Sequence, residues 1–169
     1  EFRILHRFQT FSSTNQAGTA VNDEGANSET ELIEGADPDG FLYGITRAGG
    51  TNGTGVIFKI SKESTGFAVL HTFGPITSAT DVTPALNEDG IGSASPLVAG
   101  ADDYLYGTAT NGGPNGNGTV FRVRFDGTSF EVLHAFTAIV ESESSTLPIN
   151  EDGATPIAGL TDGLDGRLY

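Results

Sequence analysis

Cysteine, methionine and tryptophan are absent from this chain, and only 8 basic residues stand against 22 acidic ones. The absence of cysteine excludes a disulfide scaffold. The net charge of −14 argues against nucleic acid as a partner, because replacing the counterions of phosphates requires lysine and arginine. No apolar run approaches the roughly 20 residues of a membrane-spanning helix, so we expect no membrane span.

Glycine is abundant instead. The 169 residues include 24 glycines, which are interspersed with valine, isoleucine, phenylalanine and tyrosine. This mixture is typical of many short β-strands joined by tight turns. The length is sufficient for one domain with a packed core. We therefore expect residues 1–169 to form one all-β domain.

A long motif occurs twice in the chain. FLYGITRAGGTNGTGVIFKI spans residues 41–60, and YLYGTATNGGPNGNGTVFRV spans residues 104–123. Leu-Tyr pairs return at a spacing of 63 residues and end at Tyr43, Tyr106 and Tyr169. Ile-Leu-His or Val-Leu-His elements lie at residues 4–6, 69–71 and 132–134. A period of this length is typical of repeat architectures such as propellers.

Each copy of the repeat contains four strand candidates in which apolar and polar residues alternate. We expect tandem four-stranded antiparallel blades of a β-propeller-like fold, with a period of about 63 residues. The blades are expected at 30–73 and 95–136, with an isolated fourth strand at 1–8 and the start of a further blade at 155–169. Because closed propellers have about four to eight blades, the chain is expected to be incomplete as a single closed ring.

A glycine pair separates the second and third strand candidates, at Gly49-Gly50 and again at Gly112-Gly113. Glycine adopts positive φ without strain, so we interpret these loops as hairpin turns. A phosphate-binding loop is the alternative. It requires a helix after the glycines, whereas the residues that follow have a strand pattern.

Three histidines, His6, His71 and His134, occupy equivalent places in their copies of the repeat. Residues related by a repeat of this size normally lie in different blades, so they would not surround one metal ion. We expect each to be a core residue hydrogen-bonded to a neighbouring backbone group.

Short acidic turns join the first and second strand candidates. Their candidate calcium ligands are Asp37, Asp39, Asp102, Asp103, Asp162 and Asp165. Carboxylate oxygens are the ligands that Ca²⁺ prefers. Aspartate before glycine favours tight turns for conformational reasons alone, so we expect turns without metal and no cofactor, with calcium binding as the alternative.

No catalytic motif accompanies the repeat. The chain lacks a GxSxG nucleophile elbow and an HExxH zinc motif. Carboxylates are numerous in the loops, but an acidic surface provides them without any glycosidase pair. Tyr43, Tyr106 and Tyr169 could stack on sugars, although their regular spacing favours packing between adjacent sheets. We expect a protein that is not an enzyme.

The pattern DGxLYGxTxxGGxxGxGxVFxI, followed by FxVLHxF, resembles the GloVer-type tandem repeat of bacterial choice-of-anchor proteins. Here it is carried by residues 39–60, 67–73, 103–123 and 130–136, and DGRLY at 165–169 opens a further copy. Ile45 stands where threonine is usual, and DDY replaces DGx in the second copy. The resemblance implies propeller-like blades and an extracellular or cell-surface location in a bacterium. It implies no catalytic residues.

Incomplete blades expose unpaired strand edges, and such edges favour association. We therefore expect a non-enzymatic extracellular structural repeat protein that is a subunit or segment of a larger assembly, such as a filament or surface layer. Its terminal strands would pair with another copy of the chain or with the remainder of a longer chain. The alternative function is a β-propeller module that binds glycan or protein at the cell surface.

Overall fold

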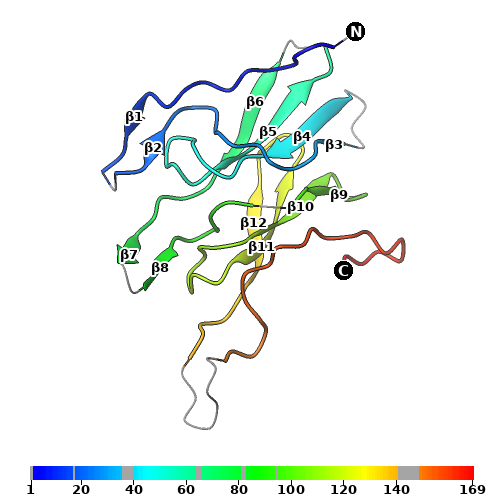
Figure 1. The fold of residues 1–169 in the computed structure, drawn as a ribbon. Coiled ribbons are helices and arrows are strands. Elements are labelled where there is room, and N and C mark those ends of the chain that lie inside the picture. Colours follow the sequence, from blue (N-terminus) through cyan, green and yellow to red (C-terminus); the bar gives the residue numbers. More distant parts are fainter. Residues whose placement is uncertain are drawn as a thin grey trace.

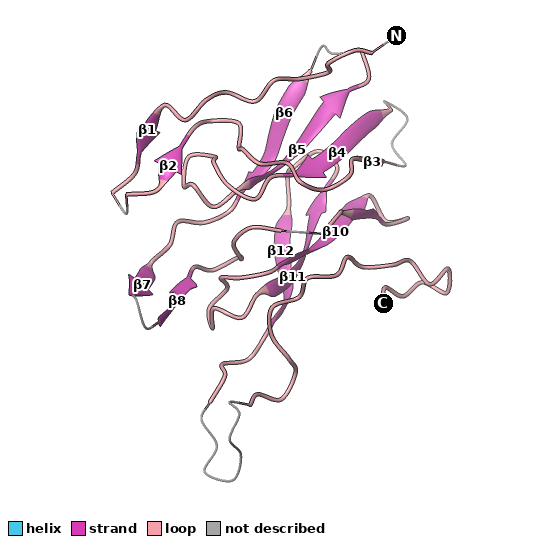
Figure 2. Cartoon of the chain, viewed as in Figure 1, coloured by secondary structure: helices cyan, strands magenta, loops and turns pink. Residues whose placement is uncertain are grey.

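A computed structural model describes residues 2–16, 18–35, 40–63, 66–80, 83–93, 95–140 and 149–169. Within these ranges every residue lies in a strand, a turn or a loop, and none is helical (Figure 2). The all-β prediction is confirmed. The strands form antiparallel sheets of two or four strands, and each sheet is open at both edges.

Two four-stranded sheets dominate the structure (Figure 1). The first has the order β3-β4-β5-β6, with β3 at Ile33–Glu34, β4 at Phe41–Ile45, β5 at Val56–Ser61 and β6 at Phe67–Thr72. The second has the order β9-β10-β11-β12, with β9 at Val98–Ala99, β10 at Tyr104–Ala109, β11 at Thr119–Arg124 and β12 at Phe130–Ala135. Short hairpins pair β1 (Ser13–Thr14) with β2 (Ala20–Val21), and β7 (Ser78–Thr80) with β8 (Thr83–Leu86).

The two large sheets pair their strands in equivalent registers. Tyr43 lies opposite Lys59 in the first sheet, and Tyr106 lies opposite Arg122 in the second. A β-bulge interrupts the last strand pair of both sheets. In the second sheet Phe121 pairs with Val132 while Val120 pairs with His134. The bulge therefore breaks the strict alternation expected from the sequence and places His134 on the face opposite Val132.

The main core lies between the two four-stranded sheets. Tyr43, Ile45 and Ile57 of the first sheet and Leu105, Phe121 and Val123 of the second are buried in one cluster. Tyr43 also lies 5.2 Å from Phe125, measured between ring centroids. The packing role expected for Tyr43 is therefore confirmed, whereas Tyr169 is 67% exposed.

The opposite face of the first sheet is covered by the N-terminal segment. Val56, Phe58 and Ile60 form a second buried cluster, against which Leu5 and Phe8 pack. Residues 2–12 nevertheless belong to no strand, although a fourth strand was expected at 1–8. This segment contributes apolar side chains to the sheet face, and among the described residues its stretch 2–11 makes no backbone pairing with a strand.

At the other end of the chain, residues 155–169 were expected to begin a further blade. The structure places here a single bridge between Asp162 and Leu168 instead of full strands. Thr161 and Tyr169 exchange backbone hydrogen bonds of 2.8 and 3.0 Å beside that bridge. The segment thus forms a narrow hairpin at the position equivalent to β9 and the start of β10.

The glycine pairs adopt positive φ, as the hairpin interpretation predicts. The φ angles are 72° and 73° at Gly49 and Gly50, and 71° and 74° at Gly112 and Gly113. The turns are also crowded, because a Cβ atom on Gly113 would lie 2.7 Å from Cγ2 of Thr119. Both the backbone conformation and the lack of space therefore require glycine at this position.

We predict that Gly113→Val destabilises the fold by about 3 kcal/mol or more, because positive φ strain adds to overpacking. Gly18→Val is the matched control, since Gly18 has a φ of 76° and no heavy atom within 4 Å of an added Cβ. Its cost is about 1–2 kcal/mol from backbone strain alone. Denaturant unfolding of both variants measures the difference. Equal costs would contradict the crowding of the turn at Gly113.

Candidate functional site

The sequence Asn-x-Asp/Glu-Gly occurs three times, at residues 22–25, 87–90 and 150–153. Each occurrence lies in the long connection that follows a Leu-His element. We call each occurrence a latch, because its asparagine and carboxylate hold backbone groups from separate segments. In the sequence, each histidine is followed 18 residues later by the carboxylate of a latch, and this fixed interval is the signal that could have identified the pairs.

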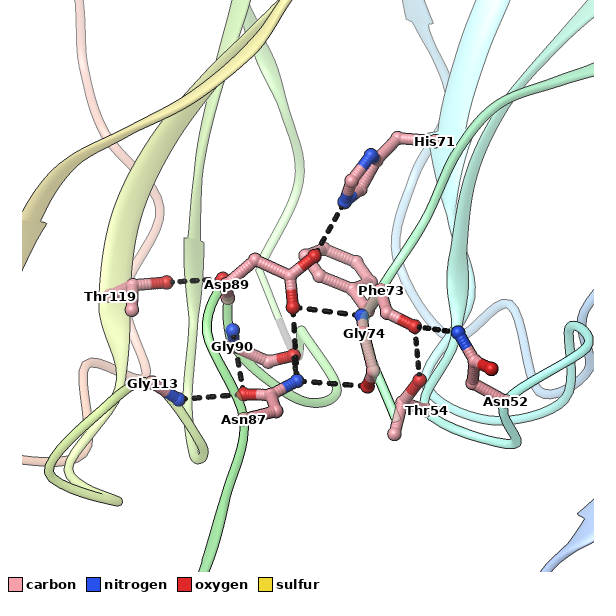
Figure 3. A network of polar contacts seen from close by, with 10 residues as sticks. All are labelled: Asn52, Thr54, His71, Phe73, Gly74, Asn87, Asp89, Gly90, Gly113 and Thr119. Carbon is pink, nitrogen blue, oxygen red and sulfur yellow. Dashed lines mark hydrogen bonds and ion pairs between the residues drawn. The ribbon is translucent and has the colours of Figure 1, made fainter. Parts of the chain in front are cut away.

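The second latch connects the two four-stranded sheets through Asn87, which is 3% exposed (Figure 3). Its Nδ2 donates hydrogen bonds to the carbonyls of Gly74 at 3.0 Å and Gly90 at 2.6 Å. Its Oδ1 accepts hydrogen bonds from the amides of Gly90 at 2.9 Å and Gly113 at 2.8 Å. One amide side chain thus joins the segment that leaves β6 to the glycine pair of the second sheet.

Asp89 extends this connection to a histidine. Its Oδ1 accepts the backbone N–H of Gly74 at 2.8 Å, and its Oδ2 accepts Nε2–H of His71 at 2.7 Å. The backbone carbonyl of Asp89 accepts the hydroxyl of Thr119 at 2.9 Å. The expectation of a histidine bonded to a backbone group is therefore wrong. A carboxylate 18 residues later is the partner, and only the folding of the long loop brings it there.

Aromatic contacts accompany the polar ones across the same boundary. The His71 ring stacks on Phe130 of β12, with centroids 3.6 Å apart and an interplanar angle of 5°. Phe73 is fully buried and meets Phe121 of β11 edge to face at 5.5 Å. The second latch therefore combines hydrogen bonds, which orient the sheets, with ring packing, which buries apolar surface.

The first latch attaches the N-terminal segment to the first sheet by the same contacts. Asn22 accepts the amide of Gly50 at 3.0 Å and donates to the carbonyl of Gln9 at 2.9 Å. Glu24 replaces aspartate here and lies 3.2 Å from Nε2 of His6. The His6 ring stacks on Phe67, with centroids 4.1 Å apart. The arrangement of the second latch is thus reproduced one sheet earlier.

The third latch is formed on one side only. Asp152 lies 2.8 Å from Nε2 of His134 and accepts the hydroxyl and the amide of Thr137 at 2.5 and 3.0 Å. Asn150 donates to the carbonyl of Thr137 at 3.1 Å and accepts the amide of Gly153 at 3.1 Å. The side chain of His134 is 49% exposed, against 20% for His71.

The hydrogen bond from the Thr137 hydroxyl lowers the pKa of Asp152 below its ordinary value, and the Thr137 amide and His134 act in the same direction. Because this folded-state pKa is depressed, the contribution of the carboxylate to stability is present above the unfolded value of about 3.9. It is lost as the pH falls through the folded value. The charged carboxylate is therefore the form that holds the third latch.

A cavity of about 670 Å³ opens beside the second latch. Its lining includes His71, Glu88, Asp89, Phe130 and Val132. The pair of His71 and Asp89 has the geometry of a base and its orienting carboxylate. Asp89 Oδ1, however, also accepts hydrogen bonds from the Gly74 amide and from Asn87 Nδ2, so the carboxylate takes part in the second latch as well.

The structure describes four of the candidate calcium ligands, with Asp102 and Asp103 in one turn and Asp162 and Asp165 in another. Asp37 and Asp39 lie outside the described residues. Asp102 and Asp165 accept the hydroxyls of Tyr106 and Tyr169 at 2.7 and 3.0 Å. Asp162 Oδ1 accepts the amide of Leu164 at 2.8 Å. Asp103 has a φ angle of 66°, and its Oδ2 lies 4.0 Å from Nη2 of Arg124.

These contacts are the ones that stabilise turns without metal. In the ranges that the structure describes, no three His, Asp or Glu side chains gather where they could share a metal ion. The calcium site stays a prediction.

Comparisons with protein-family models, with curated proteins and with solved structures find no match. The resemblance of the repeat to the GloVer-type family therefore stays a prediction. Within the described part of the chain, no helix is long and apolar enough to cross a membrane.

We predict that Asn87→Ala lowers the free energy of unfolding by about 2–4 kcal/mol, because it leaves buried amides and carbonyls without partners. Asn150→Ala is the matched control, because Asn150 holds groups of its own loop and is only partly buried. Its cost is under about 1 kcal/mol. Chemical denaturation measures both. Similar costs would show that the contact between sheets contributes nothing beyond the local loop.

Proposed function

We propose that this chain is a non-enzymatic extracellular structural repeat protein, a β-propeller-like segment of a larger assembly such as a filament or surface layer. The supporting observation is the recurrence of the latch. It attaches the N-terminal segment to the first sheet and the first sheet to the second. A third latch lies at the far end of the second sheet, with the same residues in place.

A connection of this kind suits a structure built by addition of units. In repeat proteins each unit contacts its neighbours, and stability is approximately the sum of unit and interface terms. Here each four-stranded sheet corresponds to one proposed blade. Asn87 of the second latch binds the glycine pair of the next sheet, and His71, which is bonded to Asp89 of that latch, stacks on the fourth strand of the next sheet. The same chemical contact can therefore be repeated along an array without new interface residues.

The distribution of exposed apolar residues supports association at the end of the second sheet. Among the described residues, seven of the eleven large exposed apolar residues lie beyond β11, namely Leu133, Ile139, Val140, Ile149, Ile157, Leu164 and Tyr169. Ile157 is 71% exposed and Leu164 is 91% exposed. Large apolar side chains that stay exposed occur at interaction sites, and most of the described ones follow β11 in the chain.

The extracellular bacterial location is proposed from the resemblance of the repeat to the GloVer-type repeat. The net charge of −14 is compatible with this location, because it favours solubility. The partners proposed are another copy of the chain or further repeats, which would be met at its ends. We propose no required cofactor, and calcium bound by the acidic turns is the alternative. It would bridge carboxylates that the structure leaves at the surface, such as Asp103.

Glycan binding is the second candidate, and the cavity beside the second latch favours it. Phe130 provides an aromatic ring there, and Glu88 and Asp89 provide carboxylates. Aromatic rings with neighbouring hydrogen-bonding groups are suited to sugars. In this case the protein would be retained on a glycan array, and Glu88→Gln would weaken that retention.

We predict that native particles containing this chain sediment as a polymer or closed ring. Analytical ultracentrifugation gives their mass, and negative-stain electron microscopy gives their shape. Density repeating at the size of one four-stranded sheet is the expected image. A discrete monomer that is retained on glycans would contradict the structural role and favour the second candidate.

A further inference from the structure

The end of the second sheet carries the side chains of a complete connection without the partner that the first sheet has. We define the open joint as Tyr106, Leu133, His134, Phe136 and Asn150. Their counterparts in the first sheet and its loop are Tyr43, Leu70, His71, Phe73 and Asn87. Every counterpart is turned toward the second sheet, whereas the residues of the open joint are partly or largely exposed.

Each counterpart has an identified contact across the boundary between the sheets. His71 stacks on Phe130, Phe73 meets Phe121, and Tyr43 meets Phe125. Asn87 accepts the amide of Gly113, and Leu70 packs against the shared core. These contacts are made by a glycine pair, a third strand and the first residue of a fourth strand. A matching set of groups is therefore what the open joint fits.

The open joint is already organised for such a contact. Asp152 fixes the His134 ring at 2.8 Å, and Asn150 is held to Thr137 and Gly153. Among the described residues, the only ring against His134 is Phe136, which meets it edge to face at 5.0 Å. In the described part of the chain, no ring stacks on the His134 ring as Phe130 stacks on His71. Within the ranges that the structure describes, Asn150 Oδ1 accepts one hydrogen bond, whereas Asn87 Oδ1 accepts two. Prior organisation lowers the entropy cost of binding.

The segment after the third latch also begins in the register of the established connection. The amide of Gly92 donates to the carbonyl of Thr54 at 3.2 Å as the chain enters the second sheet. The amide of Thr155, 63 residues later, donates to the carbonyl of Asn117 at 2.9 Å. The path that leads toward a third sheet thus starts as the path to the second sheet does.

We propose that the open joint is a docking surface for a further four-stranded sheet of the same repeat. The docked sheet presents the amide of a glycine pair to Asn150 and a phenylalanine, at the start of its fourth strand, to His134. This inference rests on the proposed structural function and names the partner that extends the array. The contact is made by the five residues of the open joint on one side, and by the glycine pair and the fourth strand of the docked sheet on the other.

A second copy of the chain is a poorer occupant, because its own sheets have no free set of these groups. Gly50 is bound by Asn22, and Phe67 is stacked on His6. Gly113 and Phe130 are engaged by Asn87 and His71. A second copy would have to displace its own N-terminal segment. The chemistry therefore favours a sheet whose glycine pair and phenylalanine are not yet bound.

The test extends the full chain directly after Tyr169 with a second copy of residues 107–136. Tyr169 stands where Tyr106 stands in the repeat, so the added residues continue in register and supply the missing turn and strands. We expect the His134 ring protons to move upfield in NMR spectra toward the positions of those of His71. We also expect Asn150→Ala to lower the Tm of the extended chain by several degrees while leaving that of the parent almost unchanged.

A control extension carries alanine in place of the added counterparts of Gly113 and Phe130, and it should produce neither effect. The proposal is overturned if the added residues stay unfolded on the intact chain, or if His134 and the Asn150→Ala response do not change. It is also overturned if the control extension acts equally well. Dimerisation of the parent chain that shifts His134 would make a second copy the occupant instead.

The outcomes separate this inference from the proposed function. If the open joint binds the extension but the native particle is a discrete monomer, the proposed structural role is contradicted and the docking surface is supported. A joint that stays open, in a protein whose native particle is a polymer or ring, removes the docking surface alone.

Discussion

The amide side chain of Asn87 lies where two backbone segments approach each other without forming a sheet. The carbonyl of Gly74 lies in the segment that leaves β6 of the first sheet, and the amide of Gly113 lies in the loop between β10 and β11 of the second sheet. Buried backbone groups without hydrogen bonds are costly, so a side chain with both a donor and an acceptor is required between them. Asparagine meets this requirement, and Asp89 adds the bond to His71 that fixes the neighbouring ring. The stacking of the two sheets depends on this small set of contacts.

Glycine has a related constraint at the same boundary. Gly113 can present its amide to Asn87 only because the turn has positive φ and no side chain. A Cβ on the neighbouring Gly112 would lie 2.6 Å from Oδ1 of Asn87. The glycine pair therefore shapes the hairpin and also creates the surface that the latch recognises. The repeated motif in the sequence and the repeated contact in the structure have this common cause.

Much of the fold could be predicted from the sequence, because strand patterns and glycine turns are local signals. In β11, for example, the alternating pattern places Phe121 and Val123 on one apolar face, and both residues are fully buried. The partner of His71 could not be predicted in the same way, since Asp89 reaches it only through the folded loop. The bulge opposite Val120 could not be predicted either, because apolar and polar residues continue to alternate in the sequence where the register changes. The terminal segments had strand patterns, but a strand also needs an edge to pair with, and Leu5 and Phe8 of the N-terminal segment pack on a sheet face instead.

Native-state hydrogen exchange gives the most direct test of the claim that the latch unites the sheets. The amides of Gly74, Gly90 and Gly113 donate to latch side chains, and amides of β5 and β11 report on the two sheets. If the latch unites the sheets, the opening free energies of the three glycine amides converge with those of the strand amides, to within about 1 kcal/mol, as denaturant is added. Glycine amides that exchange through low-energy local opening, while both sheets remain fully protected, would contradict it.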